Sequence, residues 1–231
     1  MPQSLKAQVV IFDVEGTLID CATQMIDCWE DTFTKAGHRI SRDELQLYSG
    51  MDGDEMLQAL MPGLSATTRK ALIEEHGRSY RRDFLEKASG VEGAHETIAW
   101  LHDKGHAIAI ATTCKDDELK KYDRMVRVLQ YCKAVCCGSQ VKRGKPHPDL
   151  FAHVLKEMGV RAADAIAIGD TPYDALAAKA AGMRAIGVTT GGFSPADLRK
   201  SGCIAVIDSV AQLTDLNWRC VVRRKGGAAL R

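Results

Sequence analysis

Asp13 stands where a carboxylate could do chemistry, directly after the apolar run Val9–Phe12. Such a run is typical of a buried strand of a parallel sheet, and Gly16 indicates the turn that ends it. Open α/β sheets bind their ligands beyond the carboxyl ends of their strands. We therefore interpret Asp13 as a candidate nucleophile or metal ligand. The alternative is an aspartate that caps the following turn.

Three later segments supply candidate partners for this aspartate. The run HAIAIATT ends in the hydroxyls of Thr112 and Thr113, and VKRGKPHPDLF holds Lys145 between a glycine and a proline. The apolar part of AIAIGDTPYDALAAKAAG ends in Asp170, with Asp174 four residues later. Taken singly, the lysine is most often a surface charge, and a threonine is common at any strand end. The whole set is far more specific than any one member.

The three aspartates, Asp13, Asp170 and Asp174, are expected to meet at one edge of the sheet. Like charges in one pocket raise one another's pKa, and a divalent cation relieves their repulsion. Ligation by carboxylate oxygens and water suits Mg²⁺. The alternative for the pair at 170 and 174 is a helix N-terminus stabilised by acids.

The elements that must position these residues alternate between strand and helix patterns. This alternation favours βαβ units and a parallel sheet. The helix that starts at Asp174 is rich in alanine and is predicted to end at Gly182. The predicted strands are Val9–Asp13, Ala107–Thr112, Ala134–Cys137, Ala165–Gly169, Ala185–Val188 and Ile204–Ile207.

The stretch from residue 19 to residue 87 interrupts the alternation, because it contains no convincing strand. Met25, Trp29 and Phe33 recur every four residues, which predicts a helix with one apolar face. Ser41 is followed three residues later by a glutamate, a capping-box pattern that predicts the start of another helix. We expect a helical insertion over the active face of the sheet.

The four ordered motifs together resemble those of the haloacid dehalogenase superfamily. The similarity runs from about Val9 to Leu213 and is greatest to the phosphoglycolate phosphatase-like and β-phosphoglucomutase-like branch. The resemblance implies an α/β fold: a Rossmann-like three-layer core with a parallel sheet, formed by residues 1–18 and 88–231. A small all-helical cap domain, residues 19–87, is inserted after the first strand, with a return hinge at residues 89–93. Such caps close over substrate and exclude water.

The resemblance also assigns roles to the residues of the motifs. Asp13 is the nucleophile that forms an aspartyl-phosphate, which water then hydrolyses. Lys145 neutralises the phosphate and holds the nucleophile ionised. Thr112 hydrogen-bonds a phosphoryl oxygen, assisted by the backbone N–H groups of Val14 and Thr113.

For the metal, the resemblance implies Mg²⁺ held by the carboxylates of Asp13 and Asp170 and by the backbone carbonyl of Glu15. Asp174 acts nearby or through a water molecule. The side chain of Glu15 is the implied general acid and base, although phosphatases of this family usually carry aspartate there. Enolase-phosphatase members share the glutamate, and the extra methylene matters because misplacement by about 1 Å can cost about 100-fold in rate.

The residue at position 15 also argues against two relatives. Dehalogenases have an aromatic residue there and lack the second acid pair. Phosphonate-cleaving members have a small residue there and a cap lysine that forms an imine; the surroundings of Lys35 do not resemble that lysine's motif.

We therefore expect a Mg²⁺-dependent phosphatase that acts on a small phosphorylated metabolite. A β-phosphoglucomutase-like mutase stays open as an alternative, as does a binding or regulatory protein whose catalysis the glutamate has weakened. Substrate choice depends on the glycine-rich loop at residues 48–54. Four cap arginines are candidates for binding a second anionic group, although arginines on helices are more often solvated; they are Arg39, Arg42, Arg81 and Arg82.

The bulk composition limits the partners. Lys+Arg 31 against Asp+Glu 30 gives a net charge of +1, so no bulk field favours nucleic acid or an anionic membrane. The start MPQSLKAQ lacks a signal-peptide pattern, and no apolar run reaches the roughly 18 residues of a membrane span. We expect a soluble cytoplasmic protein, with the basic end RRKGGAALR disordered and without catalytic weight.

The cysteines are expected to remain thiols. Of the eight, Cys132, Cys136 and Cys137 cluster closely enough to raise the question of a zinc site. The sequence AVCCG reads better as a buried strand, with its adjacent cysteines on opposite faces. No Cys-x-x-Cys pair or suitably spaced histidine supports zinc.

Overall fold

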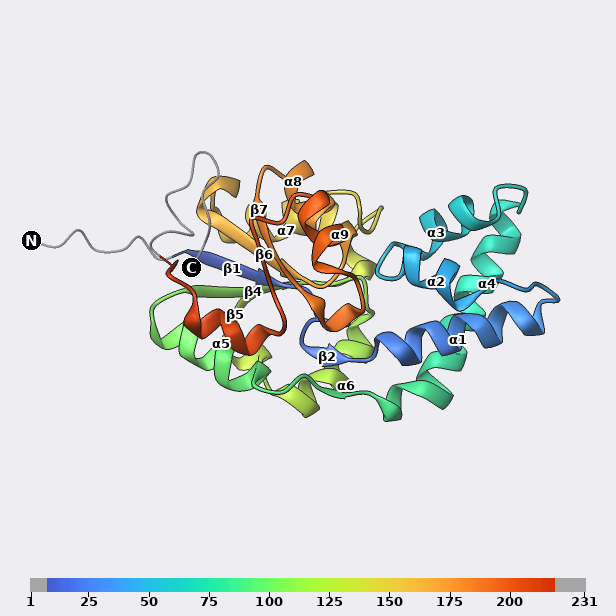
Figure 1. The fold of residues 1–231 in the computed structure, drawn as a ribbon, viewed down its shortest axis with the longest axis horizontal. Helices are drawn as coiled ribbons and strands as arrows, with labels where there is room; N and C mark the ends of the chain where they lie inside the picture. Colours follow the sequence, from blue (N-terminus) through green and yellow to red (C-terminus); the bar gives the residue numbers. More distant parts are fainter. Residues whose placement is uncertain (1–7, 219–231) are drawn as a thin grey trace, which may run out of the picture.

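A six-stranded parallel sheet forms the centre of the protein, and a computed structural model describes it for residues 8–218 (Figure 1). The strand order is β5-β4-β1-β6-β7-β8. All six predicted strands are present, with ends within two residues of the prediction. Their bounds are β1 (Val9–Phe12), β4 (Ala107–Ala111), β5 (Cys132–Cys136), β6 (Ala165–Gly169), β7 (Arg184–Val188) and β8 (Ala205–Ile207). The prediction of disorder for the basic end concerns residues outside the described range.

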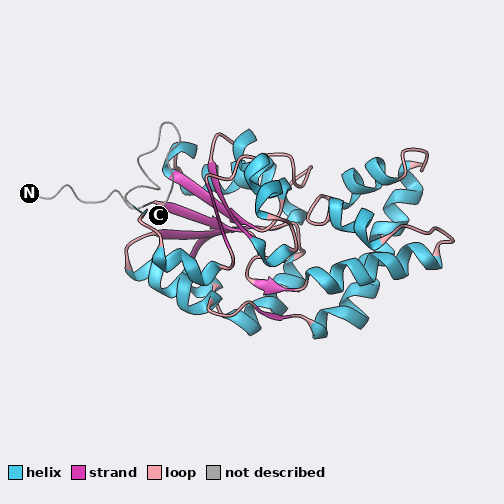
Figure 2. Cartoon of the chain, viewed as in Figure 1, coloured by secondary structure: helices cyan, strands magenta, loops and turns pink. Residues whose placement is uncertain are grey.

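Helices cover both faces of this sheet, which confirms the predicted three-layer α/β architecture (Figure 2). Alternate residues of each strand point to opposite faces. Val10 and Phe12 thus pack under α5 (Ala94–Asp103) and α6 (Asp116–Val126). On the other face, Ile11 packs under two helices, α7 (Asp149–Met158) and α8 (Pro172–Ala180). A short helix, α9 (Pro195–Lys200), contacts β7 and β8.

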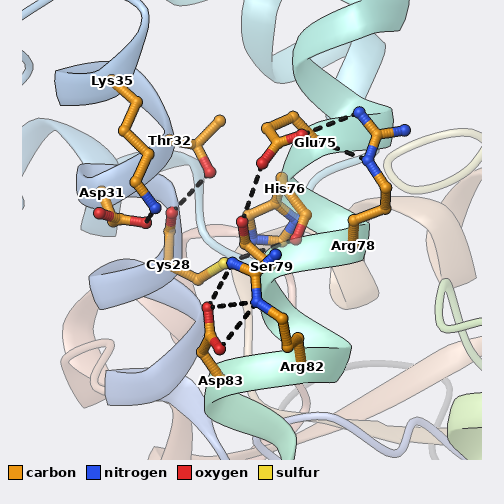
Figure 3. A network of polar contacts seen from close by, with 10 residues as sticks. All are labelled: Cys28, Asp31, Thr32, Lys35, Glu75, His76, Arg78, Ser79, Arg82 and Asp83. Atoms are coloured by element: carbon orange, nitrogen blue, oxygen red, sulfur yellow. Dashed lines mark hydrogen bonds and ion pairs between the residues drawn. The ribbon is translucent and has the colours of Figure 1, made fainter.

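Four helices between β1 and β4 pack around an apolar cluster of their own. Phe33 and Leu57 are among its fully buried members. The predicted capping box at Ser41 is present and opens α2. Figure 3 shows polar contacts within two of these helices and one that joins them, in which the Cys28 thiol donates to the carbonyl of His76 at 3.5 Å. The helices are α1 (Ala22–Lys35), α2 (Arg42–Tyr48), α3 (Gly53–Leu60) and α4 (Ala66–Ser79), which a π-helical turn (Tyr80–Phe84) continues.

The expectation that residues 19–87 contain no strand was wrong at their first two residues. β2 (Ile19–Asp20) pairs antiparallel with β3 (Ser89–Gly90), within the expected return hinge. A two-residue strand is too short to give a periodic pattern in the sequence. This pairing joins the segment that leads from the sheet into the four helices to the segment that leads back from them.

The cysteines lie as the sequence predicts. Cys136 ends β5 and packs on one face of the sheet, whereas the neighbouring Cys137 packs on the other. The seven cysteines in the described part of the chain are free thiols. Among residues 8–218, no helix is long and apolar enough to cross a membrane.

Candidate active site

The strand order brings two of the predicted acidic residues, Asp13 and Asp170, to neighbouring strand ends. β1 lies between β4 and β6, so Asp13, Thr112 and Asp170 follow the carboxyl ends of three neighbouring strands. The backbone N–H of Asp13 donates to Ile168 at 2.9 Å, and that of Thr112 to Cys136 at 3.0 Å. These bonds extend the sheet ladder by one residue and fix where both side chains begin.

Lys145 reaches this edge from the loop before α7. Its Nζ lies 2.5 Å from Oδ1 of Asp13 and 2.6 Å from Oδ1 of Asp174, and its side chain is 1% exposed. Burial lowers the pKa of the ammonium, but the two aspartates together raise it above its ordinary value. The lysine therefore stays charged and forms ion pairs with both Asp13 and Asp174.

Three buried carboxylates form one cluster here. Oxygen atoms of Asp13, Asp170 and Asp174 lie within 4.8 Å of one another. Burial raises the pKa of Asp13 to about 6, aided by Asp174 and opposed by Lys145. Burial also raises the pKa of Asp170, with Asp174 and Asp13 adding to it. A hard divalent cation fits this set, because it supplies the positive charge that the cluster lacks.

The surroundings of Asp170 leave no spare room. The hydroxyl of Thr17 donates to its Oδ1 at 2.6 Å. A Cβ built on Gly16 would lie 2.2 Å from Oδ2 of Asp170, and one on Gly191 would lie 1.8 Å from the same atom. The sequence reasoning missed Thr17 and Gly191. Thr17 belongs to the Asp-Val-Glu-Gly-Thr motif, but Gly191 follows a separate strand and carries no local signal.

Asp174 has two roles in the structure. It is the third residue of α8, and its Oδ2 accepts from the backbone N–H of Thr171 at 3.1 Å and from that residue's hydroxyl at 2.7 Å. Its other oxygen meets Lys145. Asp174 therefore stabilises the start of α8 and also contacts Lys145, while its role in the site stays a prediction.

Glu15 is held by two tyrosines that the sequence reasoning missed. The hydroxyl of Tyr122 donates to Oε1 of Glu15 at 3.0 Å, and the hydroxyl of Tyr80 lies 2.7 Å from that of Tyr122. Burial raises the pKa of Glu15 to about 8, with Glu118 and Asp13 adding to it. Both tyrosines come from segments far along the chain, so no local pattern could have pointed to them.

The remaining predicted site residues also lie near Asp13. The backbone N–H of Val14 hydrogen-bonds the Asp13 carboxyl and lowers its pKa. Thr112 is fully buried and its Oγ1 accepts from the backbone N–H of Cys114 at 3.2 Å. Thr113 lines a cavity beside Asp13, together with residues of the loop at 48–54.

The cap arginines do not reach this cavity. Arg42 pairs with two acids of α1 at 2.6 and 2.8 Å, Arg81 pairs with Glu118 at 3.1 Å, and Arg82 pairs with Asp83 at 2.6 Å. Arg39 is exposed. The three paired arginines lie on helical segments, whereas Arg39 lies in the loop between α1 and α2. None of the four lines the cavity, so they give no support to a second anion site there.

Comparison with known proteins gives consistent matches. A family model described as "Haloacid dehalogenase-like hydrolase" matches residues 10–188. "Probable phosphatase IndB" of Dickeya dadantii is 26% identical over 209 residues, which cover 89% of this chain and 91% of that protein. A phosphoglycolate phosphatase of Pseudomonas fluorescens is 25% identical over 215 residues, covering 89% of this chain and 78% of that protein. A solved hydrolase from Pseudomonas syringae matches with a TM-score of 0.84 and 25% identity, over 90% of this chain and 96% of that one.

Proposed function

The chain belongs to the haloacid dehalogenase-like hydrolases, as its motifs predict, and we propose that it is a Mg²⁺-dependent phosphatase of small phosphomonoesters. Two of its relatives are named as phosphatases, which supports the predicted enzyme class, a phosphoric monoester hydrolase. One observation carries the proposal: the ammonium of Lys145 lies between Asp13 and Asp174 within a cluster of buried carboxylates.

Asp13 is the proposed nucleophile. One of its carboxylate oxygens contacts Lys145, which leaves the other to attack phosphorus. Attack forms an aspartyl-phosphate and releases the alcohol of the substrate. Attack by water then breaks the new P–O bond and releases inorganic phosphate, so one hard displacement becomes two easier ones. Lys145, Thr112 and the N–H groups of Val14 and Thr113 are the proposed ligands of the phosphoryl oxygens.

Glu15 is the proposed general acid and base. It would give a proton to the leaving alcohol and take one from the attacking water. Its carboxyl lines the same cavity as Asp13, and Tyr122 restrains it. This restraint supports the role, because a side chain one methylene longer than the usual aspartate needs a partner to fix its position.

The proposed metal ligands are the carboxylates of Asp13 and Asp170 and the backbone carbonyl of Glu15, with Asp174 close by. The carboxylates of Asp13 and Asp170 are buried and close together, and oxygen ligands of this kind suit Mg²⁺. When bound, the ion would neutralise negative charge on the phosphoryl group.

We further propose that residues 19–87 act as a cap domain, with a small phosphorylated metabolite as the partner. The separate apolar cluster of the four helices supports this. The backbone N–H of Asp52, in the loop between α2 and α3, donates to the carbonyl of Lys145 at 2.8 Å. That contact would join the cap to the phosphate-binding loop. The cytoplasmic location stays a prediction.

The proposal is tested with p-nitrophenyl phosphate and the purified full-length chain. We expect hydrolysis that needs Mg²⁺ and stops on chelation, and that Asp13→Asn abolishes. Exposed Asp103→Asn is the matched control and keeps full turnover. Mass spectrometry of the acid-quenched protein should find a phosphoryl group on Asp13. Full turnover by Asp13→Asn would refute the mechanism, and release of an isomerised sugar phosphate would favour the mutase.

A further inference from the structure

A cavity opens directly beside Asp13, between the sheet edge and the first helices of the insertion. Its volume is about 70 Å³, and it is partly open to solvent. The sheet edge contributes Asp13, Glu15, Asp170 and Thr113. The wall opposite is largely apolar and is contributed by helices α1 to α3 and the loop before α3: Met25, Ile26, Trp29, Leu45, Tyr48, Met51 and Met56.

The charge of this lining has one sign. Among the described residues that line the cavity, the ionisable acids are Asp13, Glu15 and Asp170, and none is Lys, Arg or His. The wider outer cleft is lined by Lys115 and Lys120 and also by three consecutive acids of α6. The inner cavity therefore offers no cation to a part of the substrate beyond the phosphoryl group.

One ring of the apolar wall, that of Trp29, is held by aromatic neighbours. The ring of Trp29 stacks on His76, with centroids 3.9 Å apart and planes 11° apart, and packs on Phe33 at 5.5 Å. A ring held this way from behind loses little freedom when a ligand covers its open side. Burying apolar ligand surface there is favourable, at about 25 cal/mol per Å².

A leaving group that carries its own negative charge is disfavoured in this cavity. A carboxylate or second phosphate placed against the apolar wall would lose water and find no Lys, Arg or His in the lining to pair with, which is costly. Lys145 is already paired with Asp13 and Asp174. Resting on the phosphatase function proposed above, we propose that the substrate is the phosphate ester of an uncharged alcohol that carries an apolar chain or ring. A phosphorylated hydroxy acid such as phosphoglycolate, and a sugar bisphosphate, do not fit this lining.

The test compares three phosphate esters of primary alcohols: 2-phenylethyl phosphate, ethyl phosphate and 2-phosphoglycolate. Their reacting bonds are alike, so differences in kcat/KM report how the cavity receives the leaving group. We expect 2-phenylethyl phosphate to exceed each of the other two by about 10-fold or more. Equal or higher kcat/KM for 2-phosphoglycolate would overturn the proposal. If Lys115→Met then removed that preference, the outer cleft would be the leaving-group site.

Variants of the wall sharpen this test. Met25 and Met51 are only partly buried, so Met25→Lys and Met51→Lys each add a cation to the cavity at a tolerable position. We expect either change to lower the ratio of kcat/KM for 2-phenylethyl phosphate over 2-phosphoglycolate by about 10-fold. Met125→Lys is the matched control, because Met125 is 37% exposed on α6 and does not line the cavity. An unchanged ratio in both folded cavity variants counts against the proposal.

Binding separates this inference from the proposed activity. Calorimetry with 2-phenylethylphosphonate and 2-carboxyethylphosphonate, whose P–C bonds are not cleaved, measures the preference even if no ester is hydrolysed. We expect the phenyl ligand to bind about 10-fold more tightly. Absence of turnover with this preference intact would refute the phosphatase proposal alone. Turnover combined with tighter binding of the carboxylate ligand would refute the leaving-group proposal alone.

Discussion

Tyr122 holds Glu15 by a hydrogen bond of 3.0 Å between residues 107 positions apart in the sequence. Tyr122 is fully buried, and its hydroxyl also lies 2.7 Å from that of Tyr80, which is 1% exposed. A buried chain of hydroxyls polarises along its length, so each bond strengthens the next. The glutamate at position 15, unusual for phosphatases of this family, thus comes with a support for its longer side chain.

The first prediction concerns this support. Tyr122→Phe should lower kcat on the order of 10-fold, because Glu15 loses the bond that orients it. In a Glu15→Gln background the same substitution should cost almost nothing, since the group to be oriented is already gone. Steady-state kinetics of the four proteins gives the comparison, and Tyr131→Phe serves as the control. Equal losses in both backgrounds would mean that Tyr122 only stabilises the fold.

The second prediction concerns the space around Asp170. Gly191→Ala should lower kcat by about 100-fold, because the new methyl group would overlap Oδ2 of Asp170 and displace it. Gly63→Ala is the control, because nothing lies within 4 Å of a Cβ at that position. Thermal unfolding of both variants checks that the chain still folds. Wild-type kcat in Gly191→Ala would remove Asp170 from the proposed site.

The third prediction concerns the metal. If the cluster of Asp13, Asp170 and Asp174 binds Mg²⁺, the ion should raise the free energy of unfolding by about 2.7 kcal/mol at 100 times its Kd. Asp170→Asn should lose most of this increment, because one of the two proposed carboxylate ligands is gone. Urea unfolding with Mg²⁺ and with a chelator measures it without reference to activity. Asp103→Asn, on an exposed turn of α5, should keep the whole increment.

The positions of the catalytic candidates were predictable because each depends on a local signal. Asp13 and Asp170 follow short apolar runs, and parallel strands bring their carboxyl ends to one edge. The strand order, which no local signal gives, places the strand before Asp13 between the strands that end before Thr112 and Asp170. The predicted strand ends lie within two residues of the observed ones, because short β-branched and apolar runs flanked by turns favour buried strands.

The remaining contacts depend on tertiary packing, and no local pattern carries them. Tyr122 lies on the sheet-facing side of α6 and looks like any core tyrosine until the glutamate is placed beside it. Gly191 matters only because Asp170 fills the space over it. Trp29 belongs to the predicted apolar stripe of α1, yet it both packs on Phe33 and His76 and lines the cavity. The helical period predicts the apolar stripe, but it does not predict which of its residues face the core and which line the cavity.

The last prediction concerns pH and His76 on α4 (Figure 3). His76 is 7% exposed and stacks against Trp29. Burial, together with the nearby charges of Lys115 and Arg81, lowers its pKa to about 3.

A histidine whose pKa is depressed by folding stays neutral in the folded chain while the unfolded chain takes up a proton below about pH 6.5. Stability is therefore complete above that pH and is lost as the pH falls toward 3. Between pH 7 and pH 5 this histidine should lower the free energy of unfolding by about 2 kcal/mol.

Urea unfolding at both pH values tests this. The free energy of unfolding of His76→Gln should fall by about 2 kcal/mol less than that of wild type between pH 7 and pH 5. The carboxylates of the site titrate alike in both proteins and cancel. His153→Gln, on the partly exposed side of α7, is the control and should follow wild type. The same loss in His76→Gln as in wild type would mean that acid acts elsewhere than on the packing between α1 and α4.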